Sequence, residues 1–589
     1  MPEQPSRALL AALAGIAALA VAPALAGATG VAKEPDPVRD AATGGGTARV
    51  HSGAGGVRTL LVTHARPPRP AAARRALAPL GAVHPVVPEA GVWRVSVPPG
   101  PGAARARARA LDVPGVIGAE WSMVRVTDQA PEPPVVPAPP EVPQAEPVTD
   151  PLFSQFQWGL APATRAPRWS IDLTSGSEPT RIAVLDSGVD GDHPEWRGRL
   201  VHPRDTIRRN ADADDHGFSG HGTHVAGVAA APADGIGMVG VSPTSEVIPV
   251  RIANPEGRST DAGMIAGIRW AVIRGAKVIN ISAGGPDPTL AFAETVLWAT
   301  DRGALIVASV GNEGLESRGR TVNYPAGYPR VVGVAAQCDA SRSSFCARPY
   351  GRAAFSNVNE SVDLVAPGVN VLSTVPRRVS SDIGVPGYTY KSGTSMAAPY
   401  VTGVAALIQA ANGNDLSPHQ VARQLILTTS RIERAGRTLR TGYGLVDPTA
   451  AVRTAPPADD ADEVNDDIRW VGRPLDPPRG EPQHIDASVD HREDREDVYP
   501  VLVRRGERLD VIVRYRTGRV DLYLWGPGAR TVATEGDNVR RNLVATRLGR
   551  VRTKRITLVP ERPGIQYVNV YSRAGRSDYR AIVTVRRGR

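Results

Sequence analysis

The sequence has few lysines, only two cysteines and no long apolar run beyond its amino-terminal region. Lysine occurs only at positions 33, 277, 391 and 554, so arginine carries most of the positive charge, and the formal net charge is +10. Nucleic-acid-binding proteins concentrate basic residues in patches and stack bases on aromatic side chains. Here the arginines are interleaved with Asp and Glu, so we expect a solvated surface and no nucleic-acid partner.

The one long uncharged stretch, residues 8–32, follows Arg7 and contains Ala24-Leu25-Ala26 before Gly27. This small-x-small pattern after an apolar centre is typical of a signal peptidase site. We therefore expect residues 1–26 to be a signal peptide and the protein to be secreted, free or held at the cell surface. The alternative is a retained membrane anchor, because the span is long enough to cross a bilayer. No later segment is long and apolar enough to cross a bilayer, so we do not expect stable membrane insertion.

The two cysteines, Cys338 and Cys346, lie close together in a loop-like stretch. In an exported protein we expect them to form a disulfide that closes a small loop. A metal site would need further ligands nearby, and none is evident. Two free thiols would fit an oxidising compartment poorly.

At 589 residues the chain is too long for one domain. Two Pro-rich stretches, 127–149 and the acidic 454–482, read as linkers. They divide the chain into three predicted units, which are residues 57–126, 150–453 and 483–589.

The three units have different patterns. In 57–126, strands at 59–65, 92–97 and 119–126 alternate with helices at 71–80 and 103–111, which indicates a small α+β unit. In 483–589, period-two runs predict a small antiparallel β-sandwich. Its expected strands are 501–503, 509–515, 520–525, 566–571 and 579–585.

The central unit predicts an α/β fold. Its near-continuously apolar runs are typical of strands buried on both faces, and helical segments at 262–274 and 290–302 separate some of them. This alternation predicts a mainly parallel sheet with helices on both faces, whose ligands bind at the carboxyl ends of the strands. The runs are 181–185, 246–252, 277–281, 304–308 and 331–335.

Three side chains at such positions suggest nucleophilic chemistry. Asp186 ends an apolar run, and His221 and Ser395 each stand at the start of a helical segment. A hydroxyl needs an imidazole to accept its proton, and the imidazole needs a carboxylate to orient it. Taken singly, each residue is more often a turn or cap residue. Their combination, in the order Asp, His, Ser, carries the inference.

The segments VLDSGVDGDHPE, GHGTHVAG and SGTSMAAP, which contain these residues, resemble the signatures of the subtilisin-like serine proteases, or subtilases. The resemblance covers about half of the chain. It implies a subtilisin-like fold and a secreted serine endopeptidase of broad specificity that works through an acyl-enzyme. His221 matches the catalytic base, whereas His224 matches a helix residue with a packing role. The resemblance also implies that Asn312, in ASVGNEG, and the Ser395 backbone N–H stabilise the oxyanion.

The same resemblance implies where the substrate binds. Ser282, Ala283 and Gly284 match the edge on which subtilases hold substrate as an added β-strand. The pocket for the residue before the scissile bond should be roomy and favour large apolar residues, with Glu313 able to accept a basic one. Its expected walls are Gly311, Glu313, Tyr324, Pro325 and Ala326.

Residues 235–240 match G-x-G-x-x-G, but they follow a helical segment and precede a strand, the reverse of a dinucleotide-binding unit. They resemble the calcium loop of the family instead. The implied structural calcium ligands are Asp150, Glu195, Asp234 and the carbonyls of Ile236 and Met238. Glu195 departs from the Asp usual at its position, and no catalytic metal is expected.

Residues 57–126 resemble the subtilase propeptide, an inhibitor and folding chaperone that the enzyme removes from itself, so the expected partners are protein or peptide substrates and this propeptide. The carboxy-terminal unit resembles the pre-peptidase C-terminal-like β-sandwich of bacterial secreted peptidases. We expect a monomer. Two other readings stay open: a non-catalytic scaffold on the same fold, and a membrane-tethered processing component that retains residues 8–32.

Overall fold

The structure is a computed structural model. It describes residues 57–99, 102–127, 149–160, 179–315, 317–340, 345–432, 437–457, 468, 471, 474–490, 496–529, 532, 542–574 and 576–587. The predicted signal peptide (1–26) and most of the predicted linker 127–149 lie outside the described residues. Within these ranges, no helix combines the length and apolarity needed to span a bilayer.

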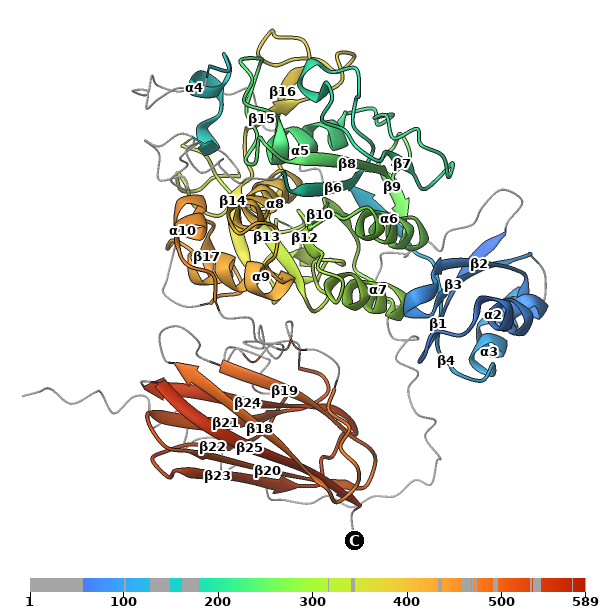
Figure 1. Ribbon diagram of the computed structural model, residues 1–589, viewed down its shortest axis with the longest axis vertical. Coiled ribbons are helices and arrows are strands. Elements are labelled where there is room, and N and C mark those ends of the chain that lie inside the picture. Colours follow the sequence, from blue (N-terminus) through green and yellow to red (C-terminus); the bar gives the residue numbers. More distant parts are fainter. Residues whose placement is uncertain are drawn as a thin grey trace, which may run out of the picture. The chain divides into compact units, whose positions relative to one another are not determined.

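The first unit is a four-stranded antiparallel sheet with two helices (Figure 1). Trp93, Val95 and Val97 alternate along one strand and share a core cluster with Leu60 and Leu77, so they form the inward face of this strand. In sheet order, the strands are β2 (Ala82–Val87), β3 (Val92–Val97), β1 (Arg58–His64) and β4 (Val116–Trp121), and the helices are α2 (Pro70–Leu77) and α3 (Ala103–Leu111).

The structure of this unit differs from the prediction in two places. Strand β2 was not predicted, because its sequence contains Pro85 and buries only its last residue fully. The single strand predicted at 119–126 is two strands, β4 and β5 (Val124–Thr127), which belong to different sheets. The break falls at Ser122, whose amide still bonds to Thr59 of the first sheet. An alternating pattern cannot reveal such a change of partner.

The central unit contains an eight-stranded sheet in which every neighbouring pair is parallel. The five predicted apolar runs form β6, β8, β10, β12 and β13, so the mainly parallel sheet is confirmed. In sheet order, the strands are β17 (Gly444–Leu445), β14 (Leu364–Pro367), β13 (Val331–Gln337), β12 (Leu305–Ser309), β10 (Val278–Ile281), β6 (Arg181–Asp186), β8 (Glu246–Arg251) and β7 (Arg204–Asp205).

Helices cover both faces of this sheet (Figure 1). Alternate residues of β6 belong to different cores: Ile182 and Val184 lie in the cluster that contains α5 and α8, and Ala183 and Leu185 lie in the cluster that contains α6 and α7. Strands buried on both faces need apolar side chains at every position, which explains the continuous runs. The helices are α5 (His221–Ala230), α8 (Thr394–Ala411), α6 (Asp261–Ile273) and α7 (Leu290–Thr300).

The carboxy-terminal unit has two four-stranded sheets around a shared core, which agrees with the predicted sandwich. One sheet has the order β18-β25-β20-β23 and the other β19-β24-β21-β22. The strands are β18 (Pro482–Asp490), β19 (Glu496–Val503), β20 (Glu507–Tyr515), β21 (Arg519–Trp525), β22 (Leu543–Arg547), β23 (Thr553–Leu558), β24 (Gly564–Ala574) and β25 (Arg576–Arg587).

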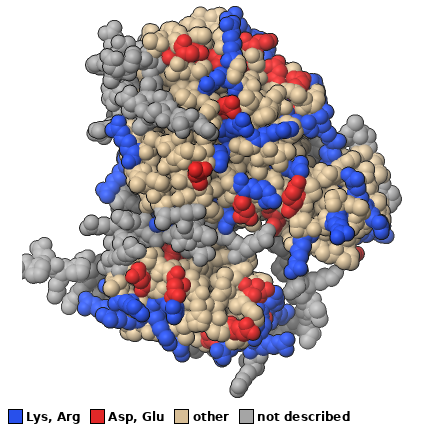
Figure 2. All heavy atoms as spheres, in the orientation of Figure 1, with Lys and Arg blue, Asp and Glu red and all other residues tan. Residues whose placement is uncertain are grey.

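Charged side chains are distributed rather than concentrated. Figure 2 shows Lys and Arg interleaved with Asp and Glu across the visible face. Many of the arginines form ion pairs at the surface, such as Arg269 with Glu89 and Arg330 with Asp301. This distribution agrees with the solvated surface expected from the sequence.

Candidate active site

The candidate site lies at the carboxyl edge of three neighbouring strands, β12, β10 and β6. Asp186 is the last residue of β6, and Ser282 follows the end of β10. Leu185 and Ile281 are register partners, so Asp186 and Ser282 occupy the same level of the sheet edge. The carboxyl ends of parallel strands are the usual ligand-binding edge of α/β sheets.

His221 and Asp186 form a buried pair. The Nδ1 atom of His221, the first residue of α5, lies 2.8 Å from Asp186 Oδ1, and the side chains are 3% and 0% exposed. The same carboxylate oxygen accepts a hydrogen bond from the Ser187 amide. His221 Nε2 is buried and has no hydrogen-bond partner among the described residues. A neutral imidazole that donates from Nδ1 has its Nε2 lone pair available to accept a proton.

A glycine permits this approach of helix to strand. A Cβ atom on Gly222 would lie 2.2 Å from the carbonyl oxygen of Gly188 and 3.0 Å from Asp186 Cβ. Any larger residue would push the first turn of α5 away from β6 and lengthen the Asp186–His221 contact.

Ser395 is buried in the first turn of α8 and is tied to β10. Its hydroxyl donates to the carbonyl oxygen of Ser282 over 3.3 Å, and the Ser282 hydroxyl donates to the Ser395 carbonyl over 3.0 Å. Asn280 donates to the Ser282 hydroxyl and accepts from Thr402 of α8. This hydrogen-bonded chain fixes Ser395 at the strand end next to that of β6.

Asn312 follows β12, the next strand of the sheet. Its Oδ1 accepts hydrogen bonds from the backbone N and the hydroxyl of Thr394, at 2.9 and 3.0 Å. Its Nδ2 is buried and has no partner among the residues that the structure describes. The amide is thus held through its oxygen, and its two N–H donors remain available.

The predicted substrate edge is paired in this structure. Ala283 and Gly284 form β11, which is antiparallel to β5 (Val124–Thr127) of the first unit. On its other side β5 pairs with β9 (Arg258–Thr260), also antiparallel. The end of the first unit therefore lies as the central strand of a three-stranded sheet at this edge.

Part of the predicted pocket wall lies beside this edge. Gly285 and Tyr324 exchange backbone hydrogen bonds, which brings the Tyr324–Ala326 turn next to β11. Glu313 is partly buried, and its carboxylate accepts a 2.7 Å hydrogen bond from Asn357. Gly311 has a φ of 96°, a left-handed conformation that residues with a side chain rarely adopt, which favours glycine there.

The five predicted calcium ligands lie in two hydrogen-bonded groups. Asp150 Oδ1 accepts from the Asp234 amide at 3.3 Å, and Glu195 Oε1 accepts from the Met238 amide at 3.0 Å and from the Tyr388 hydroxyl at 2.9 Å. The Ile236 amide donates to Asp234 Oδ1 at 3.1 Å and so joins the group of Asp150, while the side chain of Ile236 is exposed.

Both buried carboxylates are under-satisfied. One oxygen of Asp150 and one of Glu195 are buried and lack a hydrogen-bond partner among the described residues. Burial raises the pKa of Glu195 to about 8 and also raises the pKa of Asp150. Buried carboxylate oxygens without a hydrogen-bond partner fit a hard cation such as calcium. No cluster of three or more His, Cys, Asp or Glu side chains with metal-binding geometry occurs in the described ranges, so carbonyl oxygens would have to complete the shell.

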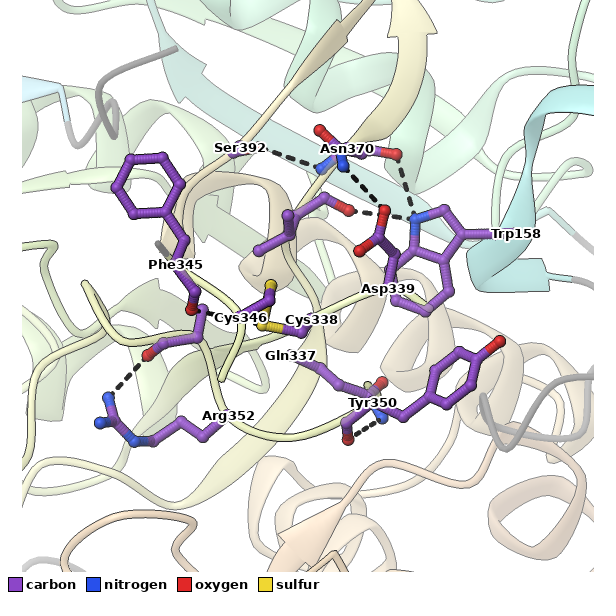
Figure 3. The surroundings of a disulfide bond; sticks show 12 residues. Trp158, Gln337, Cys338, Asp339, Phe345, Cys346, Tyr350, Arg352, Asn370 and Ser392 are labelled. Carbon is purple, nitrogen blue, oxygen red and sulfur yellow. Dashed lines mark hydrogen bonds between the residues drawn. A yellow bond between two sulfur atoms is a disulfide. The ribbon is translucent and has the colours of Figure 1, made fainter. Parts of the chain in front are cut away.

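Cys338 and Cys346 form a disulfide, with the sulfur atoms 2.11 Å apart, in the loop that follows β13. Figure 3 shows the polar contacts beside it. Asn370 donates from Nδ2 to Asp339 over 2.7 Å, and its backbone amide donates to the Ser392 hydroxyl. The disulfide loop is thereby connected to the segment that leads into α8.

Several site residues were not found by sequence reasoning. Thr394 lies inside the motif SGTSMAAP, but the motif did not indicate its role. Asn357 and Tyr388 lie in no motif, and only the tertiary fold places them at the site. The same is true of Arg125 and Asp261, which form a buried ion pair with a nitrogen–oxygen distance of 2.7 Å. His224 is fully buried, and its Nε2 lies 3.0 Å from the Val371 carbonyl oxygen, which agrees with a packing role.

Comparisons with known proteins show the family to which this chain belongs. Residues 177–444 match the subtilase family. The chain is 35% identical to subtilisin BL of Lederbergia lenta over 303 residues, which covers 98% of that protein and 50% of this chain. The chain belongs to the subtilase family of serine endopeptidases.

Other relatives of this subtilase are longer than the matched region. It is 37% identical to fervidolysin of Fervidobacterium pennivorans over 293 residues, which are 46% of this chain and 40% of fervidolysin. The crystal structure of fervidolysin, described as a keratinolytic enzyme related to subtilisin, superposes with a TM-score of 0.61. That superposition covers 89% of this chain and 88% of fervidolysin at 23% identity, so it shows only that the two proteins share a fold.

Proposed function

We propose that this protein is a secreted serine endopeptidase in which Ser395 is the nucleophile, His221 the general base and Asp186 the carboxylate that orients it. The observation that carries the proposal is the buried 2.8 Å contact of His221 Nδ1 with Asp186. It leaves Nε2 without a partner among the described residues, at the sheet edge where Ser282 holds Ser395.

In the proposed reaction, Ser395 Oγ attacks the carbonyl carbon of the scissile peptide bond as its proton passes to His221 Nε2. Asp186 stabilises the imidazolium that results. The oxyanion accepts hydrogen bonds from Asn312 Nδ2 and the Ser395 backbone N–H. The tetrahedral intermediate collapses as His221 protonates the leaving amine, and water then hydrolyses the acyl-enzyme by the same steps.

The protein is proposed to be made as a zymogen, with residues 57–126 as a propeptide that it removes itself. The pairing of β5 with β11 and β9 supports this, because a strand at that position excludes substrate from the edge. Substrate would take the same backbone hydrogen bonds. Since these bonds do not depend on side chains, they favour broad specificity.

A structural calcium ion is proposed at Asp150, Glu195 and Asp234, with the carbonyls of Ile236 and Met238. The ion would neutralise buried carboxylate oxygens and so stabilise the loop that joins α5 to β8. We expect millimolar calcium to raise the Tm of the Ser395→Ala protein, and Glu195→Gln to remove most of this rise. An equal rise in the two proteins would contradict the assignment.

The proposed function is tested by peptide hydrolysis. Ser395→Ala and His221→Ala should each lower kcat by more than about 10⁴-fold. Ser488→Ala, in the carboxy-terminal β18, serves as the matched serine control and should retain the unmodified rate. Unchanged activity in folded Ser395→Ala protein would mean that another residue is the nucleophile, whereas no hydrolysis by the folded, mature unmodified protein would support the non-catalytic scaffold.

A further inference from the structure

Arg125, in the strand that lies along the substrate edge, has an unusually buried guanidinium. Its side chain is 1% exposed, and its Nε donates to Asp261 Oδ1, which is 0% exposed, over 2.7 Å. Its Nη2 donates to the carbonyl oxygen of Asp287 over 2.5 Å. Charged side chains are seldom buried this completely unless a partner of opposite charge recognises them.

The surroundings of the guanidinium are fitted to arginine. Asp261 is the first residue of α6, whose preceding residue, Thr260, caps the helix. A Cβ atom on Gly285 would lie 3.0 Å from Arg125 Nη1, so a larger residue at this position would crowd the guanidinium. The two bonds to Asp261 and Asp287 come from two different nitrogens of the planar group, Nε and Nη2, which the single nitrogen of a lysine ammonium cannot reproduce equally well.

The register of the sheet shows which substrate residue, counted back from the bond that Ser395 would attack, lies in this pocket. Thr127 is opposite Ala283, and Val126 is opposite Gly284. In a substrate bound as β5 is, the next residue would come opposite Ser282, whose carbonyl oxygen lies 3.3 Å from Ser395 Oγ. With that residue counted as the one before the scissile bond, the position of Arg125 is the fourth before it.

Removal of β5 would leave the Asp261 carboxylate at the wall of the emptied cleft. In this structure its Oδ2 also accepts from the Met123 amide, so both carboxylate oxygens bind groups of the departing segment. Burial raises the pKa of Asp261, and the Arg125 guanidinium opposes that rise. An unpaired buried charge is costly, so a substrate that restores the pair is favoured over one that does not.

We propose that this protease has a subsite that selects arginine at the fourth residue before the scissile bond, with Asp261 as the recognising anion. The inference rests on the proposed function and adds to its broad specificity a preference for chains that carry arginine at this position. The propeptide occupies the subsite with its own arginine until it is released.

The test uses the mature protein and peptides of the form acetyl-X-Val-Thr-Z-aminomethylcoumarin, in which Z is a mixture of residues. X is arginine, lysine or citrulline, the last being a neutral analogue of nearly the same shape. We expect kcat/KM for arginine to exceed that for citrulline by at least about tenfold, the effect of one hydrogen bond to a charged group, with lysine between them.

Asp261→Asn should bring the ratio of arginine to citrulline close to one. Asp301→Asn, which removes the same charge from an exposed ion pair with Arg330, should keep the ratio of the unmodified protein. The peptide comparison in the unmodified protein holds even if Asp261→Asn fails to fold. Equal hydrolysis of all three peptides would overturn the subsite alone and leave Arg125 as an anchor of the propeptide. Hydrolysis of none would overturn the proposed function as well.

Discussion

At the scale of single residues, the candidate site is marked by buried polar atoms that are satisfied on one side only. His221 binds Asp186 through Nδ1, and Asn312 binds Thr394 through Oδ1, while the Nε2 of one and the Nδ2 of the other have no partner in the described ranges. A buried polar atom without a partner costs about 1–3 kcal/mol. Two such unpaired atoms at one edge of the sheet are explained if each binds a group that forms during the reaction.

The first prediction concerns Asn312. Asn312→Ala should lower kcat by about 10²–10³, the magnitude known for the corresponding donor of the related enzyme subtilisin, with little change in KM, because the donor acts mainly on the oxyanion. Thr394→Val should give a smaller loss, since it removes one of the two bonds that orient the amide. Steady-state kinetics on one peptide measures both, and a loss confined to KM would contradict this role.

The second prediction concerns His224, whose pKa burial holds well below its ordinary value. The folded protein therefore keeps it neutral, while the unfolded chain binds a proton below about pH 6.5. The free energy of unfolding should fall by up to about 1.4 kcal/mol per pH unit below that value, and be unaffected above it. In a Ser395→Ala background, His224→Asn should make the Tm depend less on pH between 6.5 and 5. Equal slopes of Tm against pH with and without His224→Asn would contradict a neutral, buried His224.

Motif reasoning found the residues of the candidate triad and Asn312 because their spacing is local. It missed the ion pair of Arg125 with Asp261, since these residues are 136 positions apart and meet only when two units dock. The sequence contained the charges but offered no sign of their pairing.

At the scale of elements, docking of the first unit uses helix ends as well as strands. Glu120 of β4 accepts hydrogen bonds from the amides of Leu290 and Ala291 at the start of α7, at 3.1 and 3.4 Å. A carboxylate at a helix amino terminus is stabilising because unpaired amides and the helix dipole meet it there. This contact and β5 hold the same unit at two separate places.

The disulfide gives the third prediction. Its cysteines are eight positions apart, and closing a loop of this size stabilises a fold by about 2–3 kcal/mol. The double variant Cys338→Ser, Cys346→Ser should lose that amount of unfolding free energy. Urea titration in the Ser395→Ala background measures it, and an unchanged midpoint would show that the loop is fixed by its hydrogen bonds alone.

Elements with strong patterns were predictable and short ones were not. The runs that form β6, β8, β10, β12 and β13 are apolar at nearly every position, so their burial could be inferred. Strands β7 and β17 have two residues each, too few to show any period. In the sandwich, β22 has no fully buried residue, and one of the two buried residues of β23 is a lysine, Lys554, so neither strand shows a clear apolar alternation.

At the scale of the whole molecule, the core of the sandwich is built separately from the cores of the parallel sheet. The sandwich clusters draw on residues from Ile468 onward, and none of them belongs to the two clusters that enclose the parallel sheet. The active-site residues proposed here all depend on the parallel sheet.

The fourth prediction follows from this separation. A chain that ends after Pro457 should still remove its amino-terminal segment and should hydrolyse a small peptide with kcat/KM within about twofold of the full chain. Parallel assays of the two proteins measure this. A loss of more than tenfold in folded, truncated protein would mean that the sandwich contributes to the site.

The most direct test of the central claim is the intact mass of the protein after treatment with a serine-directed phosphonylating reagent. Unmodified protein should lose its amino-terminal segment and gain one adduct, on Ser395. Ser395→Ala should not remove the segment itself, and it should gain no adduct even when limited proteolysis cuts the linker 127–149. If folded protein that has Ser395 neither matures nor gains an adduct after the same proteolysis, Ser395 is not an activated nucleophile and the proposed mechanism is wrong.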